Sequence, residues 1–209
     1  IDNTFASPVN QNPIDWWMDI VIHSATKYLN GHHDVTAGAI ISTKERIEQI
    51  TETARNFGGS LDARICYLLE RSLKTLYVRV KKQNENALQL ARFLEDHRQV
   101  GKVNYPGLES HPGHETAKRQ MRGFGGMLSF ELKDSRIIQF QKNLKLIRPA
   151  VSLGGVDTIV SSPVLTSHKS LSHEELEREG ISESLIRLSA GIENADDLIE
   201  DLDQAMDGL

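Results

Sequence analysis

Three residues that could do chemistry stand together early in the chain. Ser24, Thr26 and Lys27 follow an apolar, strand-like run that begins after Asp19, and a turn containing Gly31 comes next. A desolvated lysine amine is nucleophilic near neutral pH and forms an imine with an aldehyde. The two neighbouring hydroxyl groups could hold phosphate oxygens. The pattern therefore predicts a site for a phosphorylated aldehyde such as pyridoxal phosphate, and its alternative reading is a solvated loop lysine.

A carboxylate near the start of the chain fits the same chemistry. Residues 1–5 read as the end of a strand that enters a loop, because Ser7-Pro8 and Asn12-Pro13 oppose a continuing helix. Asp2 would then lie at the carboxyl edge of a strand, where open α/β sheets bind ligands. In a pyridoxal enzyme such a carboxylate keeps the pyridine nitrogen protonated, since the cationic ring draws electrons from the substrate's α-carbon. The alternative for Asp2 is an Asx turn.

Two residues in the second half of the chain could meet an anion. Arg187 is the sole charge in the strand-like segment 185–189, and a buried arginine needs an anionic partner. Its planar fork suits a carboxylate, either an internal acid or the α-carboxylate of a substrate. Ser152 opens a Ser-Leu-Gly-Gly turn after a strand, where its hydroxyl or the backbone amides could meet an anion.

Two histidine-containing segments resemble metal sites. Residues 30–34 read Asn-Gly-His-His-Asp, and residues 111–114 read His-Pro-Gly-His. Neither has a second cluster with matching ligand spacing, and the glycine and proline favour polar turns. We predict no metal.

The composition limits the class of protein. The chain has 209 residues, of which 39% are apolar and 25% charged, and its formal net charge of -5 argues against a nucleic-acid partner. It has no apolar stretch of membrane length. The single cysteine, Cys66, excludes an internal disulfide and indicates a cytoplasmic location. The chain opens on Ile1 without a methionine or a signal-like segment, so we expect it to be truncated.

The periodicity of apolar residues predicts two α/β lobes that position these groups. A long helical stretch over 61–97, with one possible break near Gln83-Asn84, bridges the lobes, and we place the boundary between residues 85 and 86. The second lobe alternates strands and helices. Its predicted strands are 100–105, 126–133, 146–152 and 185–190, and its predicted helices are 135–144 and a final helix capped by Asn194.

Several motifs now accumulate in a recognisable order. They are 2–8 (Asp-Asn-Thr-Phe-Ala-Ser-Pro), 23–28 (His-Ser-Ala-Thr-Lys-Tyr), 105–108 (Tyr-Pro-Gly-Leu), 152–155 (Ser-Leu-Gly-Gly) and 185–193 (Leu-Ile-Arg-Leu-Ser-Ala-Gly-Ile-Glu). Over essentially its whole length the chain resembles the Cys/Met metabolism family of pyridoxal-phosphate enzymes. The resemblance implies an α/β fold of the aspartate-aminotransferase-like type (fold type I), with residues 1–85 in a large cofactor domain and 86–209 forming a small carboxyl-terminal domain.

The resemblance assigns the cofactor site and a reaction class. It makes Lys27 the Schiff-base lysine, Asp2 the partner of the pyridine nitrogen, and Ser24 and Thr26 the phosphate ligands. The implied activity makes or breaks a carbon–sulfur bond of a sulfur amino acid by elimination or replacement, as cystathionine γ-lyase and cystathionine γ-synthase do.

The resemblance also assigns a substrate site. Arg187 would bind the substrate carboxylate, assisted by Ser152. Members that act on cystathionine at its γ-carbon often have glutamate directly before this serine, whereas Val151 stands here. An apolar side chain would not bind the distal amino group of cystathionine by charge. Methionine γ-lyase, cystathionine β-lyase and O-acylhomoserine sulfhydrylase activities therefore stay open.

Members of the family are usually homotetramers built as dimers of dimers. Their amino-terminal segment supplies a phosphate-binding loop and a tyrosine that stacks on the cofactor, and it lends residues to the neighbouring subunit's site. This chain contains none of those parts. The resemblance therefore implies a carboxyl-terminal portion that does not complete the site alone.

Two rivals come from other classes. Residues 24–27 also satisfy Ser-x-x-Lys, the nucleophile motif of penicillin-recognising serine hydrolases, which requires a helix and the motifs Ser-Asp-Asn and Lys-Thr-Gly. The chain has neither of those two motifs. The other rival is a truncated scaffold that binds no cofactor.

Overall fold

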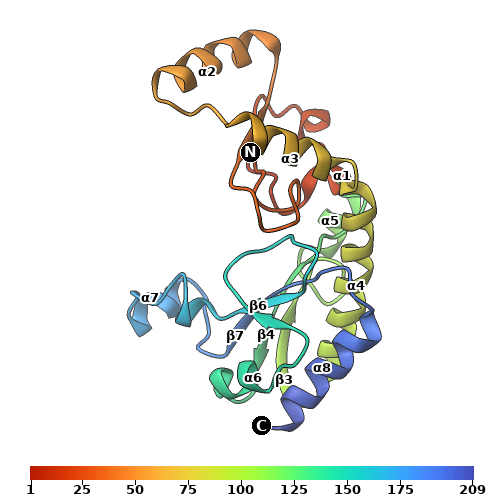
Figure 1. Ribbon diagram of the computed structural model, residues 1–209. Helices are drawn as coiled ribbons and strands as arrows, with labels where there is room; N and C mark the ends of the chain where they lie inside the picture. Colours follow the sequence, from red (N-terminus) through yellow and green to blue (C-terminus); the bar gives the residue numbers. More distant parts are fainter.

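The computed structural model describes residues 1–209, which form two β-sheets connected by the long helix α4 (Figure 1). The strands are β1 (Val21–Ser24), β2 (Gly38–Ile41), β3 (Val100–Asn104), β4 (Met127–Leu132), β5 (Arg148–Pro149), β6 (Ile159–Ser161) and β7 (Leu185–Ser189). The α-helices are α1 (Ser7–Asn10), α2 (Lys44–Asn56), α3 (Ala63–Leu73), α4 (Leu76–Asp96), α5 (His114–Gln120), α6 (Ile137–Asn143), α7 (His173–Arg178) and α8 (Ala195–Asp207). Two short 3₁₀ helices, η1 (Pro13–Trp16) and η2 (Pro163–Leu165), complete the fold. None of the helices combines the length and apolar character needed to span a membrane.

The larger sheet has the strand order β3-β4-β7-β6-β5 and is antiparallel except for the β5–β6 pair. Buried residues alternate along β4, where Leu128, Phe130 and Leu132 point into the core. This period of two is what a sheet with one covered face requires. Helices α4 and α8 pack against each other and bury Leu90 and Leu198 in that core (Figure 1).

The alternation also sets the direction of Arg187. Its neighbours Ile186 and Leu188 are fully buried in the core of the larger sheet, so the arginine points to the opposite face of β7. It pairs in register with Ser129 of β4 and Ser161 of β6. A cation is thereby held on a rigid central strand instead of on a loop.

The smaller sheet pairs β1 antiparallel to β2 and gains a parallel bridge between Asp2 and Ile22. Tyr28 and Leu29 follow β1 and pack with Leu76 and Val80 of α4 in a second, smaller apolar cluster. The start of α4 therefore belongs to the core beneath β1, while its later turns belong to the core of the larger sheet. Helix α4 therefore connects the two apolar cores.

Three details of the predicted elements are wrong. The long helical stretch is interrupted at Lys74 and Thr75, not near Gln83-Asn84, where α4 is continuous. The side chains of Gln83 and Asn84 bond to groups outside the helix, so they do not compete with its backbone. A one-turn helix, α1, begins at Ser7 where a loop was expected, because proline is tolerated in a first helical turn. The strand predicted over 146–152 shrinks to β5, in which Pro149 has no amide hydrogen to donate.

Candidate active site

Lys27 lies in a tight turn directly after β1. The turn is closed by hydrogen bonds from Lys27 N to Ser24 O (3.1 Å) and from Gly31 N to Lys27 O (2.7 Å). Its side-chain Nζ donates to the hydroxyl of Ser152 at 3.3 Å. The amine takes part in no ion pair with a carboxylate. Lys27 is therefore a half-buried amine that is free of acidic partners.

The turn at 152–155 brings Ser152 against the lysine turn. Gly154 has a backbone φ of +74°, and a Cβ atom there would lie 2.8 Å from the amide nitrogen of Tyr28, so only glycine allows this approach. The amide of Gly154 donates to the buried hydroxyl of Ser189 at the end of β7 (2.8 Å). Sequence analysis missed Ser189, because a single serine in a strand carries no signal.

Arg187 reaches the same serine from the other side. Its Nη2 donates to the main-chain oxygen of Ser152 at 3.1 Å. No carboxylate lies within ion-pair distance, so the internal acid that we considered as its partner is wrong. Burial lowers the pKa of this half-buried guanidinium, but arginine stays charged. The site therefore presents a desolvated cation that lacks an anion.

Asp2 lies beside β1, where it forms a parallel bridge with Ile22. Its Oδ1 accepts the amide hydrogen of Thr4 at 2.8 Å, which is the Asx turn named as the alternative. The turn leaves Oδ2 without a hydrogen bond to the protein, so it is compatible with the predicted contact. Hydrogen bonds from the Thr4 side chain and amide, with His23 nearby, lower the pKa of the Asp2 carboxyl. The group is exposed and ionised at neutral pH.

Thr4 is a second residue that sequence analysis missed. Its Oγ1 accepts the amide hydrogen of Ser24 at 2.8 Å, while its own amide bonds to Asp2. It therefore fixes the carboxylate relative to the end of β1. The signal was available, because the side chain of an aspartate in an Asx turn accepts from the backbone two residues on, which here is Thr4.

The two predicted phosphate ligands differ in their present contacts. The hydroxyl of Thr26 accepts the amide hydrogen of Ala37 (3.0 Å) and lies 3.3 Å from the carbonyl oxygen of the same residue. The Ser24 hydroxyl makes no hydrogen bond within the chain, so it is the freer donor. Thr26 lines an open cavity of about 540 Å³ that also contains His33 and Ser152. A cavity of about 600 Å³ between α4 and α5 contains none of the predicted site residues.

These side chains match what pyridoxal phosphate requires of a protein. The site offers an amine without an acidic partner, an ionised carboxylate with one free oxygen, and a free hydroxyl next to the amine. It also offers a separate cation for an anionic substrate group. The chemistry of this donor set fits the cofactor.

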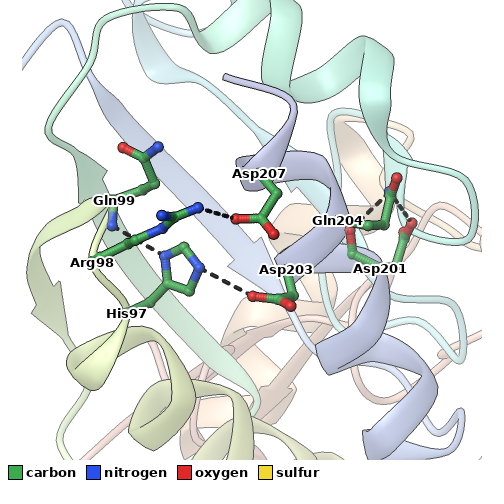
Figure 2. A network of polar contacts seen from close by, with 7 residues as sticks. All are labelled: His97, Arg98, Gln99, Asp201, Asp203, Gln204 and Asp207. Carbon is green, nitrogen blue, oxygen red and sulfur yellow. Dashed lines mark hydrogen bonds and ion pairs between the residues drawn. The ribbon is translucent and has the colours of Figure 1, made fainter.

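A second polar cluster lies between the end of α4 and α8 (Figure 2). The group His97, Asp203 and Asp207 has the ligand types of a cation site. However, His97 Nδ1 accepts the amide hydrogen of Gln99 (3.2 Å), so the ring proton is on Nε2, which donates to Asp203 (3.2 Å). Arg98 already occupies Asp207 at 2.6 Å. The cluster is best interpreted as hydrogen bonds and ion pairs that connect the end of α4 to α8.

Comparisons with known proteins identify the family. The family model described as "Cys/Met metabolism PLP-dependent enzyme" matches residues 1–207. The chain is 46% identical to a cystathionine β-lyase of Lactococcus lactis subsp. cremoris, over 99% of this chain and 55% of the relative. It is 44% identical to an L-methionine γ-lyase of Fusobacterium nucleatum subsp. polymorphum, over 100% of this chain and 54% of the relative. The chain thus spans about half the length of these relatives, and their similar identities favour neither activity.

A solved structure gives the same result for the fold. The cystathionine γ-lyase of Lactobacillus plantarum complexed with L-serine superposes with a TM-score of 0.94 at 39% identity, over 100% of this chain and 55% of that chain. The predicted fold class, an aspartate-aminotransferase-like (fold type I) α/β fold, is confirmed.

Proposed function

Because the chain belongs to the Cys/Met metabolism family of PLP-dependent enzymes, we propose that it forms part of an enzyme that makes or breaks a carbon–sulfur bond of a sulfur amino acid. One observation carries the proposal. The amine of Lys27 and the guanidinium of Arg187 come from different lobes and meet at Ser152, and neither has an acidic partner. A nucleophilic amine beside a carboxylate-binding cation is what chemistry at an amino acid's α-carbon requires.

Four residues would hold the cofactor. Lys27 would bind it covalently, Asp2 would face its ring nitrogen, and Ser24 and Thr26 would bind its phosphate. When bound, pyridoxal phosphate supplies an electron sink that stabilises negative charge at the substrate's α-carbon. The lowered pKa of the Asp2 carboxyl supports this placement, because an ionised carboxylate keeps a nearby pyridine nitrogen protonated.

The chain's own groups orient the substrate and move its protons. Arg187 binds the α-carboxylate with its planar fork, and its contact with Ser152 O keeps the guanidinium in place. Lys27 Nζ removes the α-proton as a general base. In reactions at the γ-carbon, the same amine also moves a proton from the β-carbon. Ser152 Oγ, which contacts this amine, holds it beside the carboxylate site.

The preferred reaction is that of a cystathionine γ-lyase or γ-synthase. The alternatives are methionine γ-lyase, cystathionine β-lyase and O-acylhomoserine sulfhydrylase. Val151 is exposed next to Ser152 and lines the same cavity, which favours the alternatives because a valine does not bind an amino group by charge. Asp157 also lines this cavity, and its carboxylate is a group there that would bind the distal amino group of cystathionine by charge.

We further propose that the site is completed by a neighbouring subunit, in a homotetramer built as a dimer of dimers, and by a segment outside these 209 residues. Exposed apolar residues on the small sheet support this proposal. Ile22, Ile40 and Ile41 are 44%, 43% and 44% exposed, and such apolar groups are usually covered in an assembly. We also propose the boundary at 85/86 between the lobes and a cytoplasmic location, which the single free thiol of Cys66 supports.

The rival readings have less support. A Ser-x-x-Lys hydrolase needs its serine and lysine on one helix, but Ser24 ends a strand and Lys27 lies in a turn. A cofactor-free scaffold predicts a colourless protein that stays colourless when pyridoxal phosphate is added. Both rivals are tested by the experiment that follows.

Replacing Lys27 with alanine tests the proposal. The experiment uses the whole protein, including the segment outside these 209 residues. Loaded with pyridoxal phosphate, the wild type should release products from cystathionine, methionine or O-acylhomoserine and absorb light as a cofactor-bound protein does. We expect the Lys27→Ala variant to lose both turnover and the absorbance of covalently held cofactor. Surface lysines such as Lys44, which is 91% exposed, provide the control as Lys44→Ala. Full turnover in the Lys27→Ala variant would refute the assignment.

A further inference from the structure

We infer that one face of α4 positions the active site. Arg79, Gln83 and Asn86 are spaced by four and three residues, so they lie on the same face of the helix. Each donates a hydrogen bond to a main-chain oxygen in one of the three segments that carry the lysine, the serine and the arginine of the site. The inference deepens the proposed function and rests on it.

Arg79 holds the lysine turn. Its Nη1 donates to Tyr28 O at 2.9 Å, directly after the lysine, and its Nη2 donates to Ser72 O at 3.1 Å. Arg79 is only 4% exposed and has no carboxylate partner, so main-chain oxygens and the hydroxyl of Thr75, which accepts from Nε at 3.0 Å, satisfy its charge. A Cβ atom on Gly31 would lie 2.1 Å from Nη1, so the turn closes directly over the guanidinium. This arginine acts on the lysine by fixing the turn that carries it.

Gln83 holds the turn that carries Ser152. Its Nε2 donates to Gly155 O at 2.7 Å, and the side chain is fully buried. Its Oε1 has no partner within the chain. A buried amide whose oxygen is unsatisfied is unfavourable, so the contribution of this residue lies in the donor that it offers to Gly155. An apolar side chain here would leave the carbonyl of Gly155 without that donor.

Asn86 holds the segment that follows the strand of the arginine. Its Nδ2 donates to Gly191 O at 3.0 Å and to Glu193 O at 2.9 Å. Its Oδ1 is again buried without a partner. Gly191 follows β7 directly after Ala190, so Asn86 fixes the exit of that strand. The same pattern, a buried amide retained for its donor side, occurs at two positions one helical turn apart.

The three segments are also joined to one another by main-chain bonds. Val156 N donates to Gly31 O at 3.0 Å, and Ile192 N donates to Val156 O at 2.9 Å. The turn that carries Ser152 therefore lies between the other two segments, and Gln83 is the residue of α4 that contacts it. A shift of this turn changes the position of Ser152 relative to both the amine and the guanidinium, and displacements of about 1 Å are enough to reduce catalysis strongly.

The test compares two variants of Gln83 with a matched control. Gln83→Leu removes the donor at similar size. Gln83→Glu keeps the shape, and its carboxyl donates to Gly155 O only when it is protonated. The control is Gln204→Leu on α8. Gln204 Nε2 also donates to a main-chain oxygen, Asn143 O at 2.9 Å, and in addition to O and Oδ1 of Asp201 at 3.0 Å, and none of these acceptors belongs to a segment that carries a site residue. All variants are made in the whole protein, including the segment outside these 209 residues, loaded with pyridoxal phosphate and assayed on the substrate that the wild type turns over.

We expect Gln83→Leu to lower kcat/KM by about tenfold or more, and the control to change it by less than about twofold at a comparable loss of Tm. Burial raises the pKa of a carboxyl group, so Gln83→Glu should be protonated at the acid end of the profile. At that end, the kcat/KM of Gln83→Glu should approach the wild-type value, and it should fall toward the value of Gln83→Leu as the pH rises. A purely structural contribution would not produce this dependence on pH.

Hydrogen exchange measured without substrate gives a second readout. Peptides covering residues 28–31 and 152–156 should exchange faster in Gln83→Leu than in the wild type, and unchanged in Gln204→Leu. If Gln83→Leu matches the control in both kcat/KM and exchange, and the pH profile of Gln83→Glu parallels the wild type, the inference is overturned. A wild type without carbon–sulfur activity would instead overturn the proposed function, and the exchange measurement would still test the helix.

Discussion

The core of the larger sheet and the face of α4 below the active site are both buried, but the first consists of apolar side chains and the second of polar ones. In the core, Phe130, Ile186 and Leu198 are fully buried among apolar side chains. On α4, Gln83 and Asn86 are equally buried but hydrogen-bond to main-chain oxygens of two loops. Burial in the core is driven by non-directional apolar contact. At the α4 face, directional hydrogen bonds offset the cost of burying polar groups.

This difference indicates that the apolar core mainly determines stability and that the polar face of α4 mainly determines activity. Apolar packing tolerates substitutions of similar volume, because many weak contacts share the load. A directional bond has one donor and one acceptor, so a small change moves the loop that it holds. Buried polar atoms without a partner occur at Gln83 and Asn86 on the α4 face, and also at Tyr28 and Ser162. Core substitutions should therefore affect unfolding first, and substitutions at the site should affect turnover first.

Replacing Phe130 with alanine should give the largest loss of stability. Its ring is fully buried and lies edge-on to Phe140, with centroids 6.0 Å apart. Loss of a buried phenylalanine leaves a cavity and lowers the free energy of unfolding by about 3–5 kcal/mol. Denaturant titration measures this. Tyr77→Ala on the exposed side of α4 is the control and should change stability by less than about 0.5 kcal/mol. A loss of less than about 1 kcal/mol in Phe130→Ala would mean that the core is not the main source of stability.

Replacing Arg187 with lysine should lower activity while leaving the fold intact. Lysine keeps the charge but cannot form the two parallel bonds of the guanidinium fork. We expect kcat/KM to fall by about 100-fold, which corresponds to about 2.7 kcal/mol of transition-state binding, mainly through a higher KM. Steady-state kinetics together with a melting curve separates this effect from unfolding. Arg98→Lys on the surface is the control, and equal kinetics in the two variants would remove Arg187 from the substrate site.

The sequence was sufficient where the signals are local. An apolar segment with Arg187 as its sole charge predicted β7, Asn194 predicted the start of α8 through its side-chain cap, and the end of an apolar run predicted the turn with Lys27. In each case neighbouring residues alone set the conformation. The hydroxyl pattern could not tell that Thr26 already bonds to Ala37, because that contact is made across the turn.

The sequence was insufficient where distant segments meet. Gln83-Asn84 looked like a helix break, since polar residues on an apolar stripe interrupt its pattern, but each finds its partner more than seventy residues away. The partner of Arg187 was equally open to two readings, because a sequence does not say which carboxylates come near a strand. The face of α4 that supports the site is invisible to periodicity, since its acceptors are main-chain oxygens that every residue carries.

Removing an exposed ion pair should give the smallest effect. Arg98 bonds to Asp207 at 2.6 Å, but the two side chains are 74% and 53% exposed (Figure 2). We expect Arg98→Ala to lower the free energy of unfolding by about 0.2–1 kcal/mol, and by less at high salt, because solvent and ions screen exposed charges. Denaturant titrations at low and high salt measure both.

Asp201 on the same helix provides the contrast, although it has the same charge as Asp207. It is only 5% exposed, and its carboxylate accepts the amide hydrogens of residues 145–147 at 2.8, 3.0 and 2.8 Å. Asp201→Ala would leave these three amides without their acceptor, so it should cost clearly more stability than Arg98→Ala. If the exposed pair proves as costly as the buried carboxylate, burial and direction are not what separates the two kinds of polar contact in this protein.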